Sequence, residues 1–438
     1  MKKLQLIVLS LLLLGCQNNS KKRDYIIFYV WGNTVEISAY EKMAKNYQEL
    51  SGMEVRIQPA TGNYYDNLNI LFSSKTNSPD IFFTELGQFN EQIDGDKLLN
   101  LQPYIESKAL DIKTDNNLDG SIELWDVNNS YKVNGDYYVI IKDWSPDFML
   151  WYNKNHLQEY NQANPNLAIP DLTGRTLTWS EFADISYRVG EFKNQYGTML
   201  DRVPYKHVMQ WVQQTGDSIW EEDNINFNKN ASGVFNSFKY FVELQKGTKA
   251  SAPVIGPSGI GSGEAFANGN ISFAFFGNWA YSSFDWGSVG FEMGLIPPPL
   301  PDNSPYSNYA CSAAMVGLGI NSASPVKEET VDFLNYYNKE GIKEMAFKGF
   351  NLPGNKKIAS QDEYLYPEDS KLGEINRIVV EAAENYCYEI KYNKLIPQTT
   401  IEEIFGKYFS SYLANYINTD QALQNVLNNI YNDIKNEL

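Results

Sequence analysis

The sequence predicts an α/β fold divided into two lobes or domains, and two observations carry this prediction. The chain has 438 residues, which is more than one compact core usually holds. Near the amino end, apolar β-rich runs alternate with helical patterns in the order β-α-β-α-β, which implies a parallel sheet covered by helices. Hydrophobic residues make up 43% of the chain and charged residues 20%, so we expect most of it to fold.

The first elements are the most clearly marked. Residues 25–30 form a continuous apolar run, typical of a strand covered on both faces. Residues 34–50 carry apolar side chains at helical spacing and stop at Ser51-Gly52. The next strand, helix and strand are predicted at 53–57, 66–74 and 80–84.

Later elements follow the same logic. Thr178 with Glu181 three residues on predicts a helix start with a capping box. Residues 142–146 are interpreted as a loop after a short strand, and the tail after Ile375 as largely helical. Further strands are predicted at 139–141, 148–152, 271–276 and 314–320, and helices near 264–269 and over 331–348.

The amino end has the pattern of a secretory signal. A basic start at residues 2–3 precedes a short apolar run over 4–14. Residues 13–16, Leu-Leu-Gly-Cys, resemble a bacterial lipobox, and this resemblance implies cleavage before Cys16 and attachment of lipid to that cysteine. The alternative is an ordinary signal with a chance cysteine.

Composition excludes several classes of site. The net charge is −17, which argues against a nucleic-acid surface, where a basic patch is expected. The two histidines and the absence of a Cys-x-x-Cys pair argue against a zinc site, and we expect no metal or cofactor. Aromatic residues reach 14%, which suits both core packing and stacking on ligand rings.

Two further cysteines, Cys311 and Cys387, lie far apart in the sequence among apolar residues. A disulfide is permitted outside the cytoplasm. Buried unpaired cysteine is common, however, and we expect free thiols with the disulfide as the alternative.

Several short motifs follow one another in the order seen in a known protein family. They are Asp80-Ile81-Phe82-Phe83, Trp151-Tyr152-Asn153-Lys154, Glu264-Ala265-Phe266-Ala267-Asn268-Gly269, Gly277-Asn278-Trp279-Ala280 and Gly319-Ile320-Asn321-Ser322-Ala323-Ser324. Through them nearly the whole mature chain resembles the family 1 extracellular solute-binding proteins, which include maltodextrin-binding and multiple-sugar-binding receptors. In one departure, residues 350–354 keep the proline of the family but lack its arginine, so the exact ligand is not carried over.

The resemblance implies a periplasmic-binding-protein-like clamp, in which each lobe is a sheet flanked by helices. Three hinge crossings would fall near Lys142, Ala310 and Gly349. The predicted parts are 1–23 as lipoprotein signal and tether, 24–141 and 311–349 as lobe one, and 142–310 and 350–438 as lobe two.

The same resemblance implies a receptor rather than an enzyme. The chain would be the solute-binding subunit of an ABC transporter, capturing a sugar or oligosaccharide and delivering it to a permease. Its expected partners are a carbohydrate ligand, the transmembrane subunits of the permease and, through the lipid on Cys16, the bacterial cell membrane, with no nucleic acid. We expect a monomer located outside the cytoplasm.

Candidate ligand-binding residues lie where predicted strands end. Trp279 ranks first, because in the family the aromatic of this Gly-x-Trp stacks on a sugar ring, and Asn278 beside it offers a donor and an acceptor. Asp143 and Trp144 combine a carboxylate with a stacking ring, as in sites that fix a ligand's orientation. The remaining candidates are Trp31, Asn33, Tyr64, Tyr65, Glu85, Trp211 and Trp286.

Two other classes remain open on the sequence alone. A secreted, lipid-anchored glycoside hydrolase would also have aromatic subsites, and it would need two carboxyl groups about 5 to 10 Å apart. A surface interaction lipoprotein is favoured only by the anchor. Within the binding class, peptide, polyamine or iron ligands are further alternatives, although the low histidine count disfavours iron.

Overall fold

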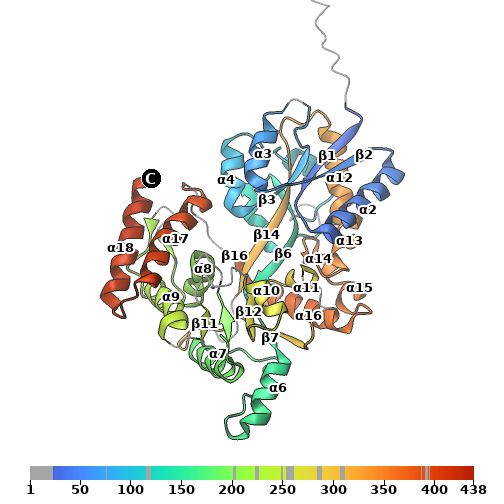
Figure 1. Ribbon diagram of the computed structural model, residues 1–438. Helices are drawn as coiled ribbons and strands as arrows, with labels where there is room; N and C mark the ends of the chain where they lie inside the picture. Colours follow the sequence, from blue (N-terminus) through green and yellow to red (C-terminus); the bar gives the residue numbers. More distant parts are fainter. Residues whose placement is uncertain are drawn as a thin grey trace, which may run out of the picture.

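The chain forms two α/β lobes that meet along a pair of long strands (Figure 1). The fold is described from a computed structural model. It covers residues 23–74, 76–114, 120–200, 204–221, 226–247, 250–252, 261–283, 289–305, 311–385, 387–389, 393 and 395–438. No helix in these ranges is long and apolar enough to cross a membrane.

Lobe one is built on a seven-stranded sheet, counted over the described residues, in the order β15-β6-β14-β3-β1-β2, with β16 paired to β14. Its strands are β1 (Tyr25–Val30), β2 (Glu54–Pro59), β3 (Ile81–Glu85), β6 (Val139–Asp147), β14 (Cys311–Ile320), β15 (Leu352–Pro353) and β16 (Cys387–Glu389). β1 runs parallel to both β2 and β3, which confirms the predicted parallel β-α-β-α-β unit. Its helices are α2 (Thr34–Ser51), α3 (Tyr64–Phe72), α4 (Leu86–Asp94), α5 (Gln102–Glu106), α12 (Lys327–Tyr336) and α13 (Lys343–Ala346).

Lobe two is built on a five-stranded sheet, again within the described residues, in the order β11-β8-β12-β7-β13. These strands are β7 (Met149–Asn153), β8 (Thr198–Met199), β11 (Ser251–Ala252), β12 (Phe273–Phe276) and β13 (Met293–Ile296). Its helices are α6 (Lys154–Ala163), α7 (Trp179–Lys193), α8 (Pro204–Gln214), α9 (Ser232–Val242), α10 (Ser262–Ala267), α11 (Ala280–Ser283), α17 (Gln398–Ala414) and α18 (Asp420–Glu437). The helices α14 (Lys356–Ala359), α15 (Asp362–Leu365) and α16 (Ser370–Asn385) lie beside the junction of the lobes.

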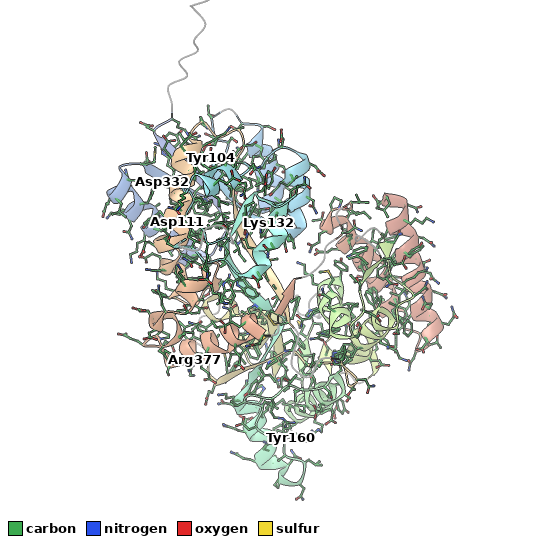
Figure 2. All side chains as sticks on the ribbon, turned by 180° about the vertical axis from the view of Figure 1, so that it is seen from behind. Tyr104, Asp111, Lys132, Tyr160, Asp332 and Arg377 are labelled. Carbon is green, nitrogen blue, oxygen red and sulfur yellow. A yellow bond between two sulfur atoms is a disulfide. The ribbon has the colours of Figure 1, made fainter. Side chains whose placement is uncertain are left out.

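The buried hydrophobic residues form two large cores. One contains the interior of lobe one and continues past the junction to Trp151 and Ala274 on one face of the second sheet. The other joins the opposite face of that sheet to α7, α8, α9, α17 and α18, with Phe238 and Phe405 stacked at 5.4 Å. The sheet of lobe two is therefore covered by helices on both faces, as the α/β prediction requires. Seen from behind, Tyr104 and Asp332 mark lobe one and Tyr160 lies at the far end of lobe two (Figure 2).

β6 continues well beyond the strand that the sequence predicts, and this corrects the interpretation of residues 142–146 as a loop. It pairs with β14 from Val139 to Asp147, with β15 on its other side, so it is buried along nearly its whole length. Opposite Val316 and Gly317 the register jumps from Asp143 to Ile141, which leaves Lys142 as the extra residue of a β-bulge. The bulge explains how two consecutive side chains, Lys142 and Asp143, meet instead of pointing to opposite faces.

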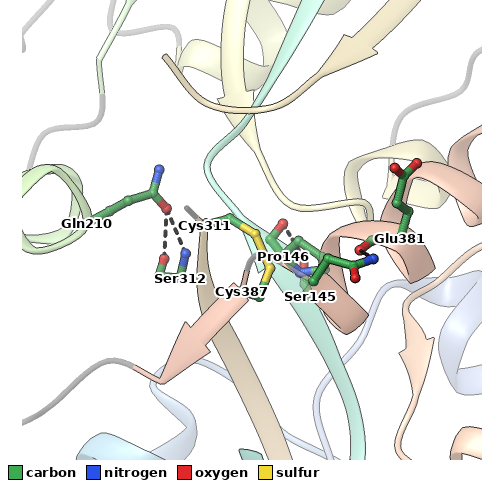
Figure 3. Close-up of a disulfide and its surroundings, with 8 residues drawn as sticks. Ser145, Pro146, Gln210, Cys311, Ser312, Glu381 and Cys387 are labelled. Atoms are coloured by element: carbon green, nitrogen blue, oxygen red, sulfur yellow. Dashed lines mark hydrogen bonds between the residues drawn. A yellow bond between two sulfur atoms is a disulfide. The ribbon is translucent and has the colours of Figure 1, made fainter. Parts of the chain in front are cut away.

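A disulfide joins Cys311 to Cys387, so the expected free thiols are wrong (Figure 3). The two cysteines are direct partners in the parallel pairing of β14 with β16, and their Cα atoms lie 4.6 Å apart. Next to the bond, Gln210 of α8 accepts hydrogen bonds through Oε1 from the backbone N–H and the hydroxyl of Ser312. The first residues of β14 are therefore tied both to the strand after α16 and to a helix of lobe two.

Candidate functional site

Three side chains from lobe one gather at the carboxyl ends of its parallel strands. Trp31 follows β1, Tyr65 lies in the first turn of α3, and Glu85 ends β3. Trp31 is half-buried and lies edge-on to Tyr65 at 6.2 Å. Ligand crevices of open α/β sheets lie at this end of the strands, so these three residues are where the sequence predicted a binding rim.

Glu85 is held in place by Tyr65. The tyrosine hydroxyl donates to Oε2 of Glu85 and accepts the backbone N–H of the same residue, both at 3.0 Å. The glutamate side chain reaches solvent, yet protein surrounds it closely. This crowding raises the pKa of the Glu85 carboxyl, an effect that the Tyr65 hydrogen bond opposes.

The charges nearest to Glu85 come from lobe two. Lys206 of α8 favours the ionised form of Glu85, and Glu402 of α17 disfavours it. Lys206 and Glu402 themselves lie 3.7 Å apart, and Glu402 accepts a hydrogen bond from Gln398 at 2.7 Å. Glu85 thus lies between the lobes, where both contribute polar groups. Sequence reasoning did not single out Lys206, Gln398 or Glu402.

Trp279 lies at the end of β12 in lobe two, as predicted. Its ring is half-buried and lies 5.7 Å from that of Phe276, at a steep angle. A Cβ atom at Gly277 would lie 2.7 Å from the indole and 2.0 Å from Oγ of Ser145 on β6, so this glycine lets the indole lie against the junction of the lobes. Asn278 is buried, and its Oδ1 accepts no hydrogen bond from any described residue.

Besides Asn278, four predicted site residues lie inside the protein rather than at its surface, which corrects their expected positions. Tyr64 donates to the backbone of Tyr29 and accepts from Phe83, while Trp144 lies against Trp125 in the core. Trp211 is buried among aromatic rings of lobe two. The fourth residue, Asp143, is described next.

Asp143 is only 2% exposed, and protein groups occupy both of its oxygens. Lys142 forms an ion pair with Oδ2, and Asn351 donates to Oδ1 at 3.2 Å. Burial raises the pKa of Asp143, although the ammonium of Lys142 lowers it in part. The carboxylate therefore neutralises the lysine at the bulge and does not face solvent.

The remaining candidates divide into two groups. Asn33 is exposed, but its Oδ1 accepts the backbone N–H groups of Val35 and Glu36 and so caps α2. Trp286 and the lipid-attachment candidate Cys16 lie outside the described residues. Of the predicted site residues that the structure describes, those that reach the surface without serving as a cap are Trp31, Tyr65, Glu85 and Trp279.

Lobe two also contains a cavity of about 1140 Å³ between α7 and α9, and none of the predicted site residues lines it. Its carboxylates have protein partners: Asp184 accepts from Arg188, and Asp217 accepts the backbone N–H of Gly233 at the start of α9. Among the described residues, no group of His, Cys, Asp and Glu side chains is arranged to hold a metal ion. We therefore place the candidate site between the lobes.

Comparison with known proteins agrees with this two-lobed arrangement. The family model of the bacterial extracellular solute-binding proteins matches residues 42–372. The chain belongs to this family. No curated protein sequence matches it significantly.

Solved structures with the same fold include other solute-binding proteins. An ABC substrate-binding protein from Listeria monocytogenes in complex with cycloalternan has a TM-score of 0.76 and 19% identity, covering 94% of this chain and 99% of that one. A cyclic alpha-maltosyl-1,6-maltose binding protein from Arthrobacter globiformis has a TM-score of 0.71 and 18% identity, covering 94% of this chain and 99% of that one. UgpB from Mycobacterium tuberculosis in complex with glycerophosphocholine has a TM-score of 0.74 and 14% identity, covering 95% of this chain and 98% of that one. These similarities establish the two-lobed fold.

Replacing Glu85 with Gln is expected to stabilise this solute-binding protein at pH 7. A carboxyl whose pKa is raised on folding favours the folded state below its unfolded pKa, about 4.3, and loses that contribution as the pH rises through the folded pKa. The melting temperature of Glu85→Gln should therefore exceed that of the parent at pH 7, and the difference should vanish near pH 4. A variant that melts below its parent at pH 7 would contradict this. Glu41→Gln, at an exposed position in the middle of α2 of the same lobe, is the matched control.

Proposed function

We propose that the chain is the solute-binding receptor of an ABC importer and that its solute is a sugar or oligosaccharide. The main support is the composition of the site between the lobes. In lobe one the half-buried rings of Trp31 and Tyr65 lie beside the carboxylate of Glu85, and in lobe two the half-buried indole of Trp279 follows β12. Aromatic faces stack on the C–H faces of sugar rings, while carboxylates accept hydrogen bonds from hydroxyls.

The solutes named for related folds agree with this choice. Cycloalternan and cyclic alpha-maltosyl-1,6-maltose are both oligosaccharides, and they belong to two of the structures above. Glycerophosphocholine, named for a third, shares hydroxyl groups but adds a phosphodiester and a quaternary amine. The carboxylates Glu85 and Glu402 outnumber the single ammonium of Lys206 and disfavour a phosphate beside them, so we assign a neutral carbohydrate.

A thermal-shift experiment with maltose, cycloalternan, cyclic alpha-maltosyl-1,6-maltose and glycerophosphocholine tests the proposal. A solute that binds only the folded chain stabilises it by about 2.7 kcal/mol at a concentration of 100 times Kd, which raises the melting temperature. A shift with glycerophosphocholine alone would refute the carbohydrate assignment, and no shift with any of the four would count against this solute class. Chromatography of each sugar after incubation separates binding from hydrolysis, because a receptor leaves the sugar intact.

The importer role also requires the receptor to stay near its permease, and we propose that a lipid on Cys16 holds it at the cell membrane. This rests on the basic start, the short apolar run and the Leu-Leu-Gly-Cys ending. We further propose that the receptor acts as a monomer that docks on the transmembrane subunits.

Replacing Cys16 with Ala is expected to abolish labelling of the chain by a radioactive fatty acid in cells that produce it. A lipid anchor has one attachment point, so the loss should be complete and the chain should move from the membrane to the soluble fraction. Ser20→Ala serves as the control, because it changes the same N-terminal segment but keeps Cys16, so it should leave the label unchanged. Equal label in Cys16→Ala and the parent chain would refute the anchor.

A further inference from the structure

One contact between the two lobes lies at a glycine beside the site. Gly87 lies in the first turn of α4, two residues after Glu85. A Cβ atom at Gly87 would lie 2.2 Å from Oε1, 3.2 Å from Cδ and 3.4 Å from Cβ of Gln398, the first residue of α17. The glutamine side chain of lobe two thus rests directly against the backbone of lobe one.

Gln398 is not a loose surface side chain. Its Nε2 donates to Oε1 of Glu402 at 2.7 Å, one helical turn further along α17, and Lys206 lies 3.7 Å from the same oxygen. Pro397 immediately precedes the helix, and its ring fixes the backbone φ angle where α17 begins. These contacts hold the amide of Gln398 toward Gly87.

The size of residue 87 is critical because the contact includes the base of the glutamine as well as its tip. A single methyl group would need only the flexible end of Gln398 to move. A larger side chain would also meet Cβ of Gln398, which moves only with α17 itself. Such a side chain would therefore force the first turns of α4 and α17 apart.

We propose that Gln398 resting on Gly87 is an interlobe stop that determines how far the lobes close, and hence how closely Glu85 approaches Lys206 and Glu402. This inference rests on the proposed function, since closure matters only if the solute binds between the lobes. It assigns a positioning role to Gly87 and Gln398. The stop fixes the width of the site at the edge formed by α4 and α17 without either residue having to touch the solute.

The test measures the distance between the lobes without any solute. Nitroxide labels are attached to cysteines at Ile70 in lobe one and Ile417 in lobe two, which are 70% and 59% exposed, in the full chain carrying Cys16→Ser. Double electron–electron resonance then gives the distance between the two labels, which reports the distance between the lobes. Gly87→Leu should lengthen the mean distance by about 2 Å or more, the scale of a domain rearrangement. Gln398→Ala, which removes the stop, should shorten it.

Opposite shifts in the two variants support the stop, because general damage to the fold would not produce both signs. Gly406→Ala is the matched control, since a Cβ there meets nothing within 4 Å although the residue lies in the same helix, α17. An unchanged distance in Gly87→Leu, or a shift of the same sign in both variants, overturns the inference. Because no solute is added, failure here is distinguishable from failure of the carbohydrate assignment in the thermal-shift panel.

Discussion

Replacing both Cys311 and Cys387 with Ala is expected to lower the free energy of unfolding by about 4 kcal/mol. The bond spans a sequence separation of 76 residues, and a cross-link of that length removes much of the chain entropy of the unfolded state. Cys311 is fully buried, so the new alanine also leaves a small void. Denaturant titration followed by tryptophan fluorescence measures the change as a lower unfolding midpoint.

Reduction of the parent chain provides the control for this variant. A reducing agent should lower the midpoint of the parent toward that of the double variant and should leave the double variant unchanged. The loss of stability on reduction should be greatest at the junction of the lobes, because the bond fixes β16 to the start of β14. A parent that unfolds at the same midpoint with and without reductant would show that the bond contributes nothing.

Replacing Trp279 with Ala is expected to weaken solute binding by on the order of thirtyfold, equivalent to about 2 kcal/mol. The half-buried indole presents an apolar face at the end of β12, and Asn278 beside it has an oxygen that accepts no bond from the described residues. Calorimetry with whichever sugar shifts the melting temperature gives the affinity. Trp279→Phe keeps an aromatic face and should retain most of the binding.

Stability measurements distinguish a ligand-binding role of Trp279 from a role in core packing. Trp144 is 1% exposed, so Trp144→Ala should cost roughly 3 to 5 kcal/mol of stability, as for a core aromatic. Trp279→Ala should bind poorly while melting close to its parent. If it instead melts as early as Trp144→Ala, the indole serves the core. If both affinity and melting are retained, Trp279 has no part in the site.

Local signals predicted the fold well where each element carries its own pattern. The run at 25–30 matches β1 (Tyr25–Val30), and Thr178 with Glu181 forms the capping box that begins α7. These features depend on neighbouring residues alone, so one sequence is enough to find them. The limits of the lobes and the ligand roles of the candidate residues stay predictions.

The missed features depend on contacts distant in the sequence. Lys142 and Asp143 look like a polar loop, and only the bulge against β14 with β15 on the other edge turns them into a buried ion pair. The pairing of Cys311 with Cys387 depends on the parallel register of two strands, to which spacing gives no clue. Lys206 and Glu402 lie on amphipathic helices, where a charge facing the other lobe looks like any solvated charge.

The disulfide has a consequence for how the protein is delivered. A chain that crosses a membrane from its amino end presents Cys311 well before Cys387, with all of α16 between them. Until that helix and β16 have arrived, the thiol at the start of β14 has no native partner, and a truncated or stalled chain keeps it open to mixed disulfides. The bond between β14 and β16 therefore forms only after α16 and Cys387 have crossed, so it is a late step in the folding of the delivered chain.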